Sequence, residues 1–260
     1  MFRQTGLQCL IVVLLLVTQS ACSTLSKDVT GSTAKVGTAS VESKGWERVN
    51  RSIYGFNKGL DTVIVKPLAR GYRAVTPAIV DRGITNFFGN LSDVKTSVNA
   101  LLQLKGRSAL TSAGRVVVNS TVGLGGLMDV ASKMNMKKYN EDFGQTLAHW
   151  GVKSGPYVML PIVGPSTLRD AAGLVVDGFL DPALYSKYPG ELTAVKLIDK
   201  RADLLSSEKA LSDLSSDMYS ATRDVWLQRR AYQLQDGKVG AASKSQQDEM
   251  IDLLEELEDE

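Results

Sequence analysis

No stretch of this 260-residue chain reaches the ~18 consecutive apolar residues that a transmembrane helix needs, and its apolar segment from Leu10 to Val17 has only eight. The sequence therefore excludes a protein with several membrane spans. Its 43% apolar and 22% charged residues are ordinary for a folded chain, which excludes disorder throughout. Both cysteines, Cys9 and Cys22, lie near the N-terminus, so a disulfide scaffold is excluded as well.

The N-terminus has the pattern of an export signal. Arg3 supplies a positive start, residues 10–17 form the apolar core, and small residues then lead to Cys22. Ser20-Ala21-Cys22 resembles a bacterial lipobox, in which the cysteine thiol accepts a diacylglycerol and becomes the new N-terminus. We therefore predict a lipoprotein signal peptide over residues 1–21, with lipidation of Cys22 and a flexible tether over residues 22–45.

The residues around the lipobox leave one alternative and suggest a destination. Gln19 departs from the apolar residue that is usual there, and the alternative is an ordinary signal cleaved near Ala21. Ser23, rather than an aspartate, follows the cysteine, which resembles the sorting pattern for the outer membrane. We expect a protein in the outer membrane of a Gram-negative bacterium, facing the periplasm and anchored through Cys22.

The charge of the chain is divided between a basic body and an acidic tail. Residues 248–260 carry eight acidic and no basic residues, which leaves 30 basic against 20 acidic residues in 1–247. The basic residues form no block interleaved with aromatic residues, so we expect no nucleic acid partner. Over residues 237–260 we predict a flexible linker and an amphipathic acidic helix. The apolar side of this helix is formed by Met250, Leu253, Leu254 and Leu257. We expect this side to bind a groove of a partner protein. The alternative is that the tail only solubilises the chain.

From Trp46 onward the apolar residues recur at helical spacing. The first helical face steps by three and four residues and consists of Trp46, Val49, Ile53, Phe56, Leu60 and Val63. Lys66-Pro67 and Thr76-Pro77 predict breaks, after which separate helices are expected over 79–91 and 94–102. No run alternates apolar and polar residues over several strands, so we predict an all-α fold and no sheet.

Two central segments are rich in glycine or proline. Gly123, Gly125 and Gly126 stand among apolar residues that include Met128. These glycines predict turns or, alternatively, a close approach of the backbone to a ligand or another helix. They match neither a P-loop nor a dinucleotide-binding motif, so phosphate cradling is not supported. The second segment, residues 156–165, contains three prolines that divide it into runs too short for long helices.

The sequence does not predict an enzyme. His149 is the only histidine, which excludes a histidine-rich metal site, and we expect no catalytic residues, metal or cofactor. A triad of Ser166, His149 and Asp170 stays open, because triads assemble in space rather than in sequence. A lipid hydrolase is therefore one rival hypothesis.

Many collinear segments of the chain resemble one family, the MlaA (VacJ) outer-membrane lipoproteins. The densest matches are Gly123 to Asp129, Glu141 to Leu147, Trp150-Gly151-Val152, Gly155-Pro156-Tyr157, Leu160-Pro161 and Leu168-Arg169-Asp170. Upstream matches are Asn50-Arg51, Phe56-Asn57, Leu60-Asp61, Lys66 to Ala69, Tyr72-Arg73, Pro77, Asn86 to Leu91, Leu101 to Gln103, Arg115 and Asn119. Lys95 departs from the family, which often has a proline near this place.

The resemblance implies a function without covalent chemistry. It implies a ring-like arrangement of amphipathic helices, residues 46–236, that lies in one leaflet of the outer membrane around an amphipathic channel. Phospholipid misplaced in the outer leaflet would leave through this channel, which maintains lipid asymmetry. The implied partners are phospholipid, a trimeric porin and a periplasmic lipid carrier, MlaC, which the acidic tail would bind. The alternative is a lipoprotein that only scaffolds the envelope.

The candidate channel residues come from the glycine-rich and proline-rich segments. Those expected to border the channel are Gly123, Gly125, Gly126, Met128, Tyr157 and Leu160. Arg115 and Arg169 are expected to attract a headgroup phosphate, because guanidinium groups bind phosphate well. The alternative for each arginine is a structural salt bridge.

Overall fold

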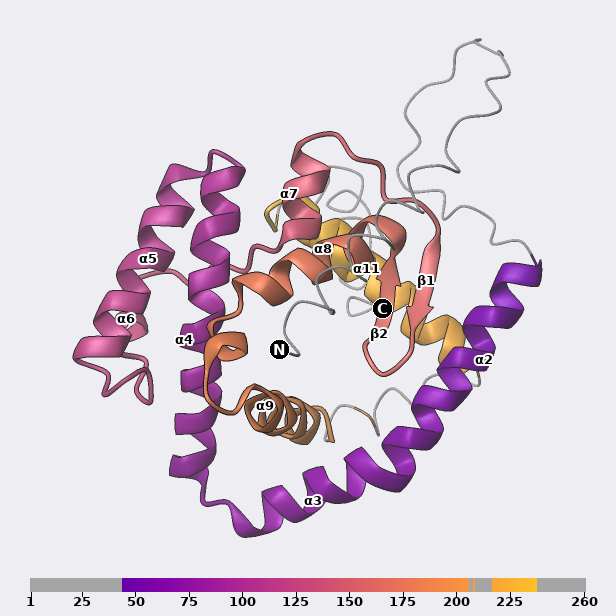
Figure 1. The fold of residues 1–260 in the computed structure, drawn as a ribbon, viewed down its shortest axis with the longest axis horizontal. Helices are drawn as coiled ribbons and strands as arrows, with labels where there is room; N and C mark the ends of the chain where they lie inside the picture. Colours follow the sequence, from indigo (N-terminus) through magenta and orange to yellow (C-terminus); the bar gives the residue numbers. More distant parts are fainter. Residues whose placement is uncertain (1–43, 206–207, 209–216, 238–260) are drawn as a thin grey trace, which may run out of the picture. The chain divides into compact units, whose positions relative to one another are not determined.

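The computed structural model describes residues 44–205, 208 and 217–237 (Figure 1). The expected signal peptide, Cys22, most of the tether and the acidic tail with its four apolar residues lie outside this part. The described residues belong to one unit of the chain, residues 40–260. Helices predominate in them, which confirms the all-α prediction. None of the described helices is long and apolar enough to cross a membrane.

One helical path runs from α2 (Lys44–Leu60) through the π-helix η2 (Asp61–Val65) into α3 (Lys66–Val75). The predicted break at Pro67 is therefore wrong. A proline ring inside an α-helix clashes with the carbonyl four residues earlier. Here the N–H of Lys66 bonds to the carbonyl of Asp61, five residues back, so the turn is wider before the proline. The break predicted at Thr76 is confirmed, because its backbone is extended before Pro77.

The chain from Ala78 to Leu102 forms one helix, α4, where two had been expected. Lys95 stands inside it, and a lysine keeps the backbone hydrogen bond that a proline at this place would remove. Helix α5 (Gly106–Thr121) packs along α4, and the short helices α6 (Val130–Lys133) and α7 (Phe143–His149) follow.

A β-hairpin interrupts the helices. Strands β1 (Tyr157–Leu160) and β2 (Gly164–Thr167) pair antiparallel, with Tyr157 opposite Thr167, and are the only strands in the described residues. The expectation of no sheet is wrong at this point. Strands of four residues, one flanked by Pro156 and Pro161 and the other containing Pro165, are too short to show the alternation that predicts a strand.

Two asparagines of α2 bind the backbone of the hairpin beside β1. The amide of Asn50 donates to the carbonyl of Tyr157 over 3.2 Å and accepts from the N–H of Met159 over 2.8 Å. Two helical turns further on, Asn57 donates to the carbonyl of Leu160 over 2.9 Å and accepts from the N–H of Ile162 over 2.8 Å. The amides thus satisfy edge groups that a third strand would otherwise satisfy.

The remaining elements close a circuit of contacts (Figure 1). They are α8 (Leu168–Leu180), the 3₁₀ helix η3 (Pro182–Tyr185), α9 (Pro189–Asp203) and α11 (Met218–Leu234). Contacts lead from α2 to β1, β2, α8, α7 and α4, then from α4 to α9 and α3, which continues from α2. This circuit agrees with the ring-like arrangement implied by the family resemblance. Helix α11 contacts α7 and β2.

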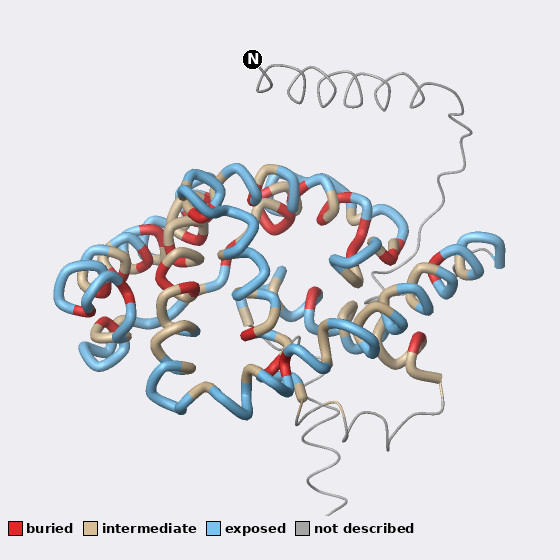
Figure 2. Tube along the Cα trace, turned by 60° about the horizontal axis from the view of Figure 1, so that its bottom comes forward, coloured by how far each residue is buried: buried red, intermediate tan, exposed pale blue. Residues whose placement is uncertain are grey.

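Burial in the described residues is distributed unusually. The largest fully buried side chains are polar, and buried apolar residues are mostly alanines. Many large apolar side chains are exposed, among them Val75 at 79% and Leu104 at 88%. Figure 2 shows buried residues only as short pieces between exposed ones. Apolar exposure on this scale is typical of a protein that contacts a membrane or a partner.

Candidate functional site

A cavity of about 320 Å³ lies between α4, α8, α11 and the β-hairpin. Its walls combine charged, polar and apolar side chains, so it suits a molecule with both kinds of surface. The lining residues are Lys95, Asp142, Val163, Pro165, Ser166, Asp170, Leu174, Asp177, Trp226, Arg229, Arg230 and Gln233.

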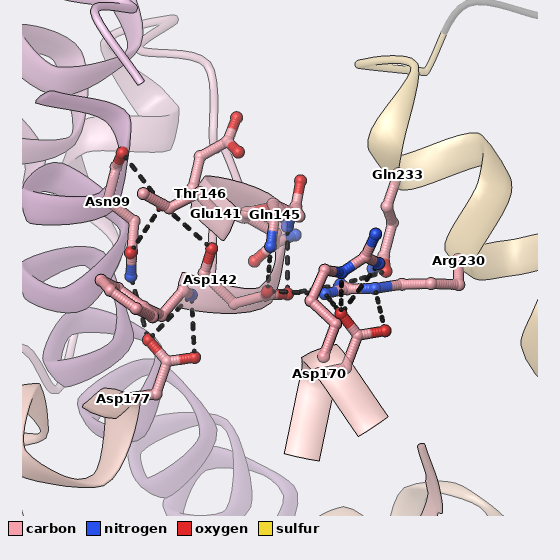
Figure 3. Close-up of polar contacts among 12 residues, drawn as sticks. Asn99, Glu141, Asp142, Gln145, Thr146, Asp170, Asp177, Arg230 and Gln233 are labelled. Atoms are coloured by element: carbon pink, nitrogen blue, oxygen red, sulfur yellow. Dashed lines mark hydrogen bonds and ion pairs between the residues drawn. The ribbon is translucent and has the colours of Figure 1, made fainter. Parts of the chain in front are cut away.

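Arg230 of α11 organises one wall of the cavity (Figure 3). Its guanidinium binds both oxygens of Asp142, the N-cap of α7, and both oxygens of Asp170 in the first turn of α8. Burial alone would raise the pKa of Asp142, but the hydrogen bonds and charge of Arg230, together with Gln145, hold it below its usual value. The wall is therefore charged but internally compensated.

Asp177 of α8 organises a second polar wall, toward α4. Its carboxylate accepts from the side-chain amide of Asn99 over 2.9 Å and from the N–H of Phe143 over 3.1 Å. The ammonium of Lys95 lies 3.9 Å from the same carboxylate. Burial raises the pKa of Asp177, against the effect of these partners. Asn99 also accepts from the hydroxyl of Thr146, so the wall joins α4, α7 and α8 (Figure 3).

The rest of the lining is apolar. Val163 and Pro165 come from the hairpin, Leu174 from α8 and Trp226 from α11. The ring of Trp226 packs edge-on against Tyr157, with centroids 6.0 Å apart. Val163 and Leu174 stay exposed, which leaves their surface available to an apolar ligand.

Arg115 forms a structural salt bridge, which was the alternative to binding a headgroup phosphate. It is 1% exposed, and its guanidinium donates to Asp93, Asp129, Ser132 and the carbonyl of Met136. These contacts account for all of its N–H groups. The prediction that Arg115 attracts a headgroup phosphate is therefore not supported, because its donors are already bound inside the protein.

The glycine-rich segment makes close backbone approaches, but to the protein itself. Gly126 has φ +94°, and a Cβ there would lie 2.8 Å from the side chain of Asn90 on α4. A Cβ on Gly123 would lie 2.3 Å from the carbonyl of Met128, whereas one on Gly125 would meet open space. None of Gly123, Gly125, Gly126 and Met128 lines the cavity described above. Gly126 thus fits the alternative of packing against another helix, whereas Gly123 contacts its own segment and Gly125, with φ +71°, fits the predicted turn.

The other candidates from the sequence lie near the cavity without lining it. Tyr157 is buried in a cluster with Met159 and Tyr219, and Leu160 is half-buried at the end of β1. Val163, which lies between Pro161 and Pro165, lines the cavity. Arg169 is buried and pairs with Asp170, again the structural alternative.

The three residues of the possible triad are not assembled for catalysis. The hydroxyl of Ser166 is buried and donates to the carbonyl of Thr167. Asp170 is occupied by Arg169, Arg230 and Thr167, while His149 is exposed at the end of α7. Within the described residues no group of His, Cys, Asp and Glu side chains could hold a metal ion.

Most lining residues were missed by sequence reasoning. Asp142 was accessible to it, because an aspartate three residues before a glutamine is a recognisable N-cap signal, and here the Asp142 carboxylate accepts from both the backbone N–H and the side-chain amide of Gln145. Lys95, Asp177 and Arg229 carry no such local signal. Their proximity arises from contacts between helices that are distant in sequence.

Comparison with known proteins gives this fold and site a family. The family model for the MlaA lipoprotein matches residues 43–233. A solved structure, described as "Structural basis for maintenance of bacterial outer membrane lipid asymmetry", matches with a TM-score of 0.65 and 34% identity, over 72% of this chain and 97% of that one. The chain belongs to the MlaA lipoprotein family.

Individual relatives extend the match beyond the family model. The "Intermembrane phospholipid transport system lipoprotein MlaA" of Escherichia coli K12 is 34% identical over 91% of this chain and 98% of its own length. The protein of that name from Haemophilus influenzae is 28% identical over 82% of this chain. An uncharacterised protein of Rickettsia felis is 36% identical over 69% of this chain and 73% of its own length.

Proposed function

We propose that this protein is an outer-membrane lipoprotein of intermembrane phospholipid transport. It removes mislocalised phospholipid from the outer leaflet and passes it toward the periplasm, which maintains lipid asymmetry. The observation that carries the proposal is the match to the Escherichia coli transport lipoprotein over 98% of that protein's length. The mixed lining of the cavity supports it, because a phospholipid presents a charged headgroup and apolar acyl chains.

The anchoring follows from the N-terminus. In this proposal residues 1–21 are removed as a signal peptide, Cys22 carries the lipid, and residues 22–45 tether residues 46–236 to the outer membrane. A lipid anchor and exposed apolar helices suit a body that lies in one leaflet. Phe56, Val75 and Ile79, all more than half exposed on α2, α3 and α4, supply part of the apolar surface.

The proposed partners are phospholipid, a trimeric porin that holds the body in the membrane, and the soluble periplasmic carrier MlaC. The acidic tail within residues 237–260 would catch the carrier through its apolar side, and the linker would raise its local concentration. A chain that ends at Gly237 should bind the purified carrier more weakly in a pull-down. Undiminished binding would leave the tail as a solubilising segment.

Transport in this proposal needs no catalytic residue. The charged groups of the cavity are bound to one another or positioned to bind a headgroup, and the proposed work is binding and passage. A lipid hydrolase would instead release free fatty acid in a manner that Ser166→Ala abolishes. A pure scaffold would leave surface phospholipid unchanged when the protein is deleted.

The test is complementation of an Escherichia coli strain that lacks its own MlaA. The whole chain should lower the amount of phospholipid at the cell surface to the wild-type level. A Cys22→Ala variant, expressed at equal amount, should fail, because it loses the anchor. Surface phospholipid that stays high with a well-expressed, correctly sorted chain would refute the proposal.

A further inference from the structure

An apolar patch lies where the end of α4 meets the end of α7. The indole N–H of Trp150, the C-cap of α7, donates to the carbonyl of Leu102 in the last turn of α4 over 3.2 Å. Trp150 is 53% exposed, and tryptophan is a side chain that often carries the energy of a protein interface. We call this surface the α4–α7 patch, and its exposed apolar residues are Leu101, Leu102, Leu104, Trp150 and Val152.

Leu104 is the most exposed member of the patch, at 88%. Its φ of +58° is a left-handed conformation that usually belongs to glycine or asparagine at the end of a helix. This conformation closes α4, because the N–H of Leu104 bonds to the carbonyl of Leu101 and the N–H of Lys105 bonds to that of Ala100. A glycine would close the helix without strain. The leucine keeps the strain and adds an apolar side chain that is available for a contact.

The chain leaves its described part beside this patch. After α11, Asp236 and Gly237 both have positive φ, and the N–H of Gly237 bonds back to the carbonyl of Tyr232. The carboxylate of Asp236 forms an ion pair with Lys105, the residue that follows Leu104. Residues 238–260 therefore start next to the α4–α7 patch.

The distance along the chain from Gly237 to the acidic tail is short. Residues 238–247 separate Gly237 from the acidic residues 248–260. A flexible linker of this length spans roughly 17 Å on average. A segment tethered in this way has an effective concentration in the millimolar range at a surface beside its attachment point. Even a patch of modest affinity would then be occupied by the tail.

The composition of the tail complements the patch and its border. The apolar residues of the predicted tail helix recur at helical spacing on one side, and the acidic residues cover the rest. Arg107 follows Leu104 by three residues, and Lys153 follows Trp150 by three. Both are exposed, and neither has an ion pair with another described residue. An acidic amphipathic helix therefore fits here better than a neutral or basic one.

We propose that the acidic tail, residues 248–260, docks on the α4–α7 patch of its own chain. Its apolar side would cover Leu104 and Trp150, and its carboxylates would lie toward Arg107 and Lys153. This inference goes beyond the proposed function, which assigns the same apolar side to the periplasmic carrier. The docked tail is then a resting state from which the carrier has to displace it.

Photo-crosslinking in the full-length chain tests the docking. The crosslinker p-benzoylphenylalanine replaces Leu104, and the protein is placed in nanodiscs of phosphatidylethanolamine and phosphatidylglycerol. Irradiation should join position 104 to residues 248–260 within one molecule, which mass spectrometry maps. In the matched control the crosslinker replaces Val63, which is 74% exposed on η2. The yield of crosslinks from there to the tail should be about tenfold lower.

A variant of the tail tests the apolar contact. Leu253→Ser with Leu254→Ser keeps the charge of the tail but removes half of its large apolar side chains. The yield from position 104 should fall about tenfold. Amide hydrogen exchange gives a second measurement without any change in the body of the protein. Residues 101–107 and 149–153 should exchange about threefold more slowly in wild type than in this variant.

A variant of the border tests the charged contact. Arg107→Gln with Lys153→Gln should lower the crosslinking yield about twofold, and added salt should have the same effect on wild type. The matched control is Arg48→Gln with Lys133→Gln, which removes the same charge from exposed positions on α2 and α6. Its yield should equal that of wild type.

The outcomes separate this inference from the proposed function. Equal yields from positions 104 and 63, or equal exchange in wild type and the tail variant, would overturn the docking. Crosslinks from position 104 only to lipid would assign the patch to the membrane, and crosslinks only between two copies would assign it to a dimer, so either result would overturn it too. The proposed function fails by a different result, which is a wild-type chain that does not complement.

Discussion

Arg230 on α11 and Asp142, the N-cap of α7, form a bidentate ion pair, with Nη1 to Oδ2 at 2.6 Å and Nη2 to Oδ1 at 2.7 Å. The same carboxylate caps α7 by accepting the N–H of Gln145. One aspartate thus begins a helix and holds a second helix that is distant in sequence. Because Arg230 also binds Asp170, α11 is tied to the N-terminal ends of both α7 and α8.

Replacement of Arg230 should be strongly destabilising. Arg230→Met leaves Asp170 and Asp142 without their main partner, and removal of one side of a buried ion pair costs about 3–5 kcal/mol. Urea unfolding of the full-length chain measures the loss. The control Gln228→Ala, exposed on the same helix, should change the free energy of unfolding by less than about 0.5 kcal/mol. A loss below 1 kcal/mol for Arg230→Met would contradict the role given to this pair.

Two glycines of α8 should respond to alanine in opposite directions. A Cβ on Gly173 would lie 2.5 Å from the backbone nitrogen of Gly144 in α7, so Gly173→Ala forces the helices apart and should cost about 1–3 kcal/mol. Gly178 has open space around it, and Gly178→Ala should stabilise the helix by up to about 1 kcal/mol. Thermal unfolding of the two variants checks this. An equal effect at both positions would show that α7 and α8 do not pack so closely.

The two asparagines that bind the hairpin should differ in importance. Asn50→Ala leaves the N–H of Met159 without its acceptor in a buried place, while the carbonyl of Tyr157 keeps the hydrogen bond from the indole N–H of Trp46, so the cost should be that of one unsatisfied group, about 1–3 kcal/mol. Asn57→Ala frees the N–H of exposed Ile162, which water can reach, so the cost should be under about 1 kcal/mol. Urea unfolding gives the order, and the reverse order would refute the argument.

Asp129 should make stability depend on acid pH. Burial opposes its ionisation, but hydrogen bonds from Ser132, Arg115 and Asn119 outweigh burial and lower its pKa from 3.8 to about 2. Because the folded pKa lies below the unfolded one, this stabilisation is present above about pH 4 and is lost as the pH falls through 2. Asp129→Asn should therefore be less stable than wild type at pH 7, and the difference should vanish toward pH 2.

Unfolding in urea at pH 7, 4 and 2.5 measures this trend. Ser132→Ala removes one of the hydrogen bonds to Asp129 and should show a smaller loss with the same pH dependence. If the difference between Asp129→Asn and wild type is the same at every pH, the carboxylate is not what the network stabilises.

Local rules predicted much of the fold and failed at identifiable places. The periodicity from Trp46 onward predicted a helix, and α2 spans Lys44–Leu60. The same rules placed a break at Pro67, where a π turn accommodates the ring, and divided α4, which is continuous through Lys95. Local rules describe preferences, and a helix can absorb one unfavourable residue when its neighbours pack well.

The sequence by itself determined that the chain is helical and that it belongs to the MlaA family. It also determined that the described part contains no transmembrane helix. These conclusions rest on periodicity, proline spacing and motif order, which are local properties. It did not determine that Arg115 is bound to Asp93 and Asp129, or that Lys95, Asp177 and Arg229 meet at one cavity. Those facts depend on which helices pack together. The free energy of a buried charge is set by the groups around it in space, and only the tertiary structure specifies these groups.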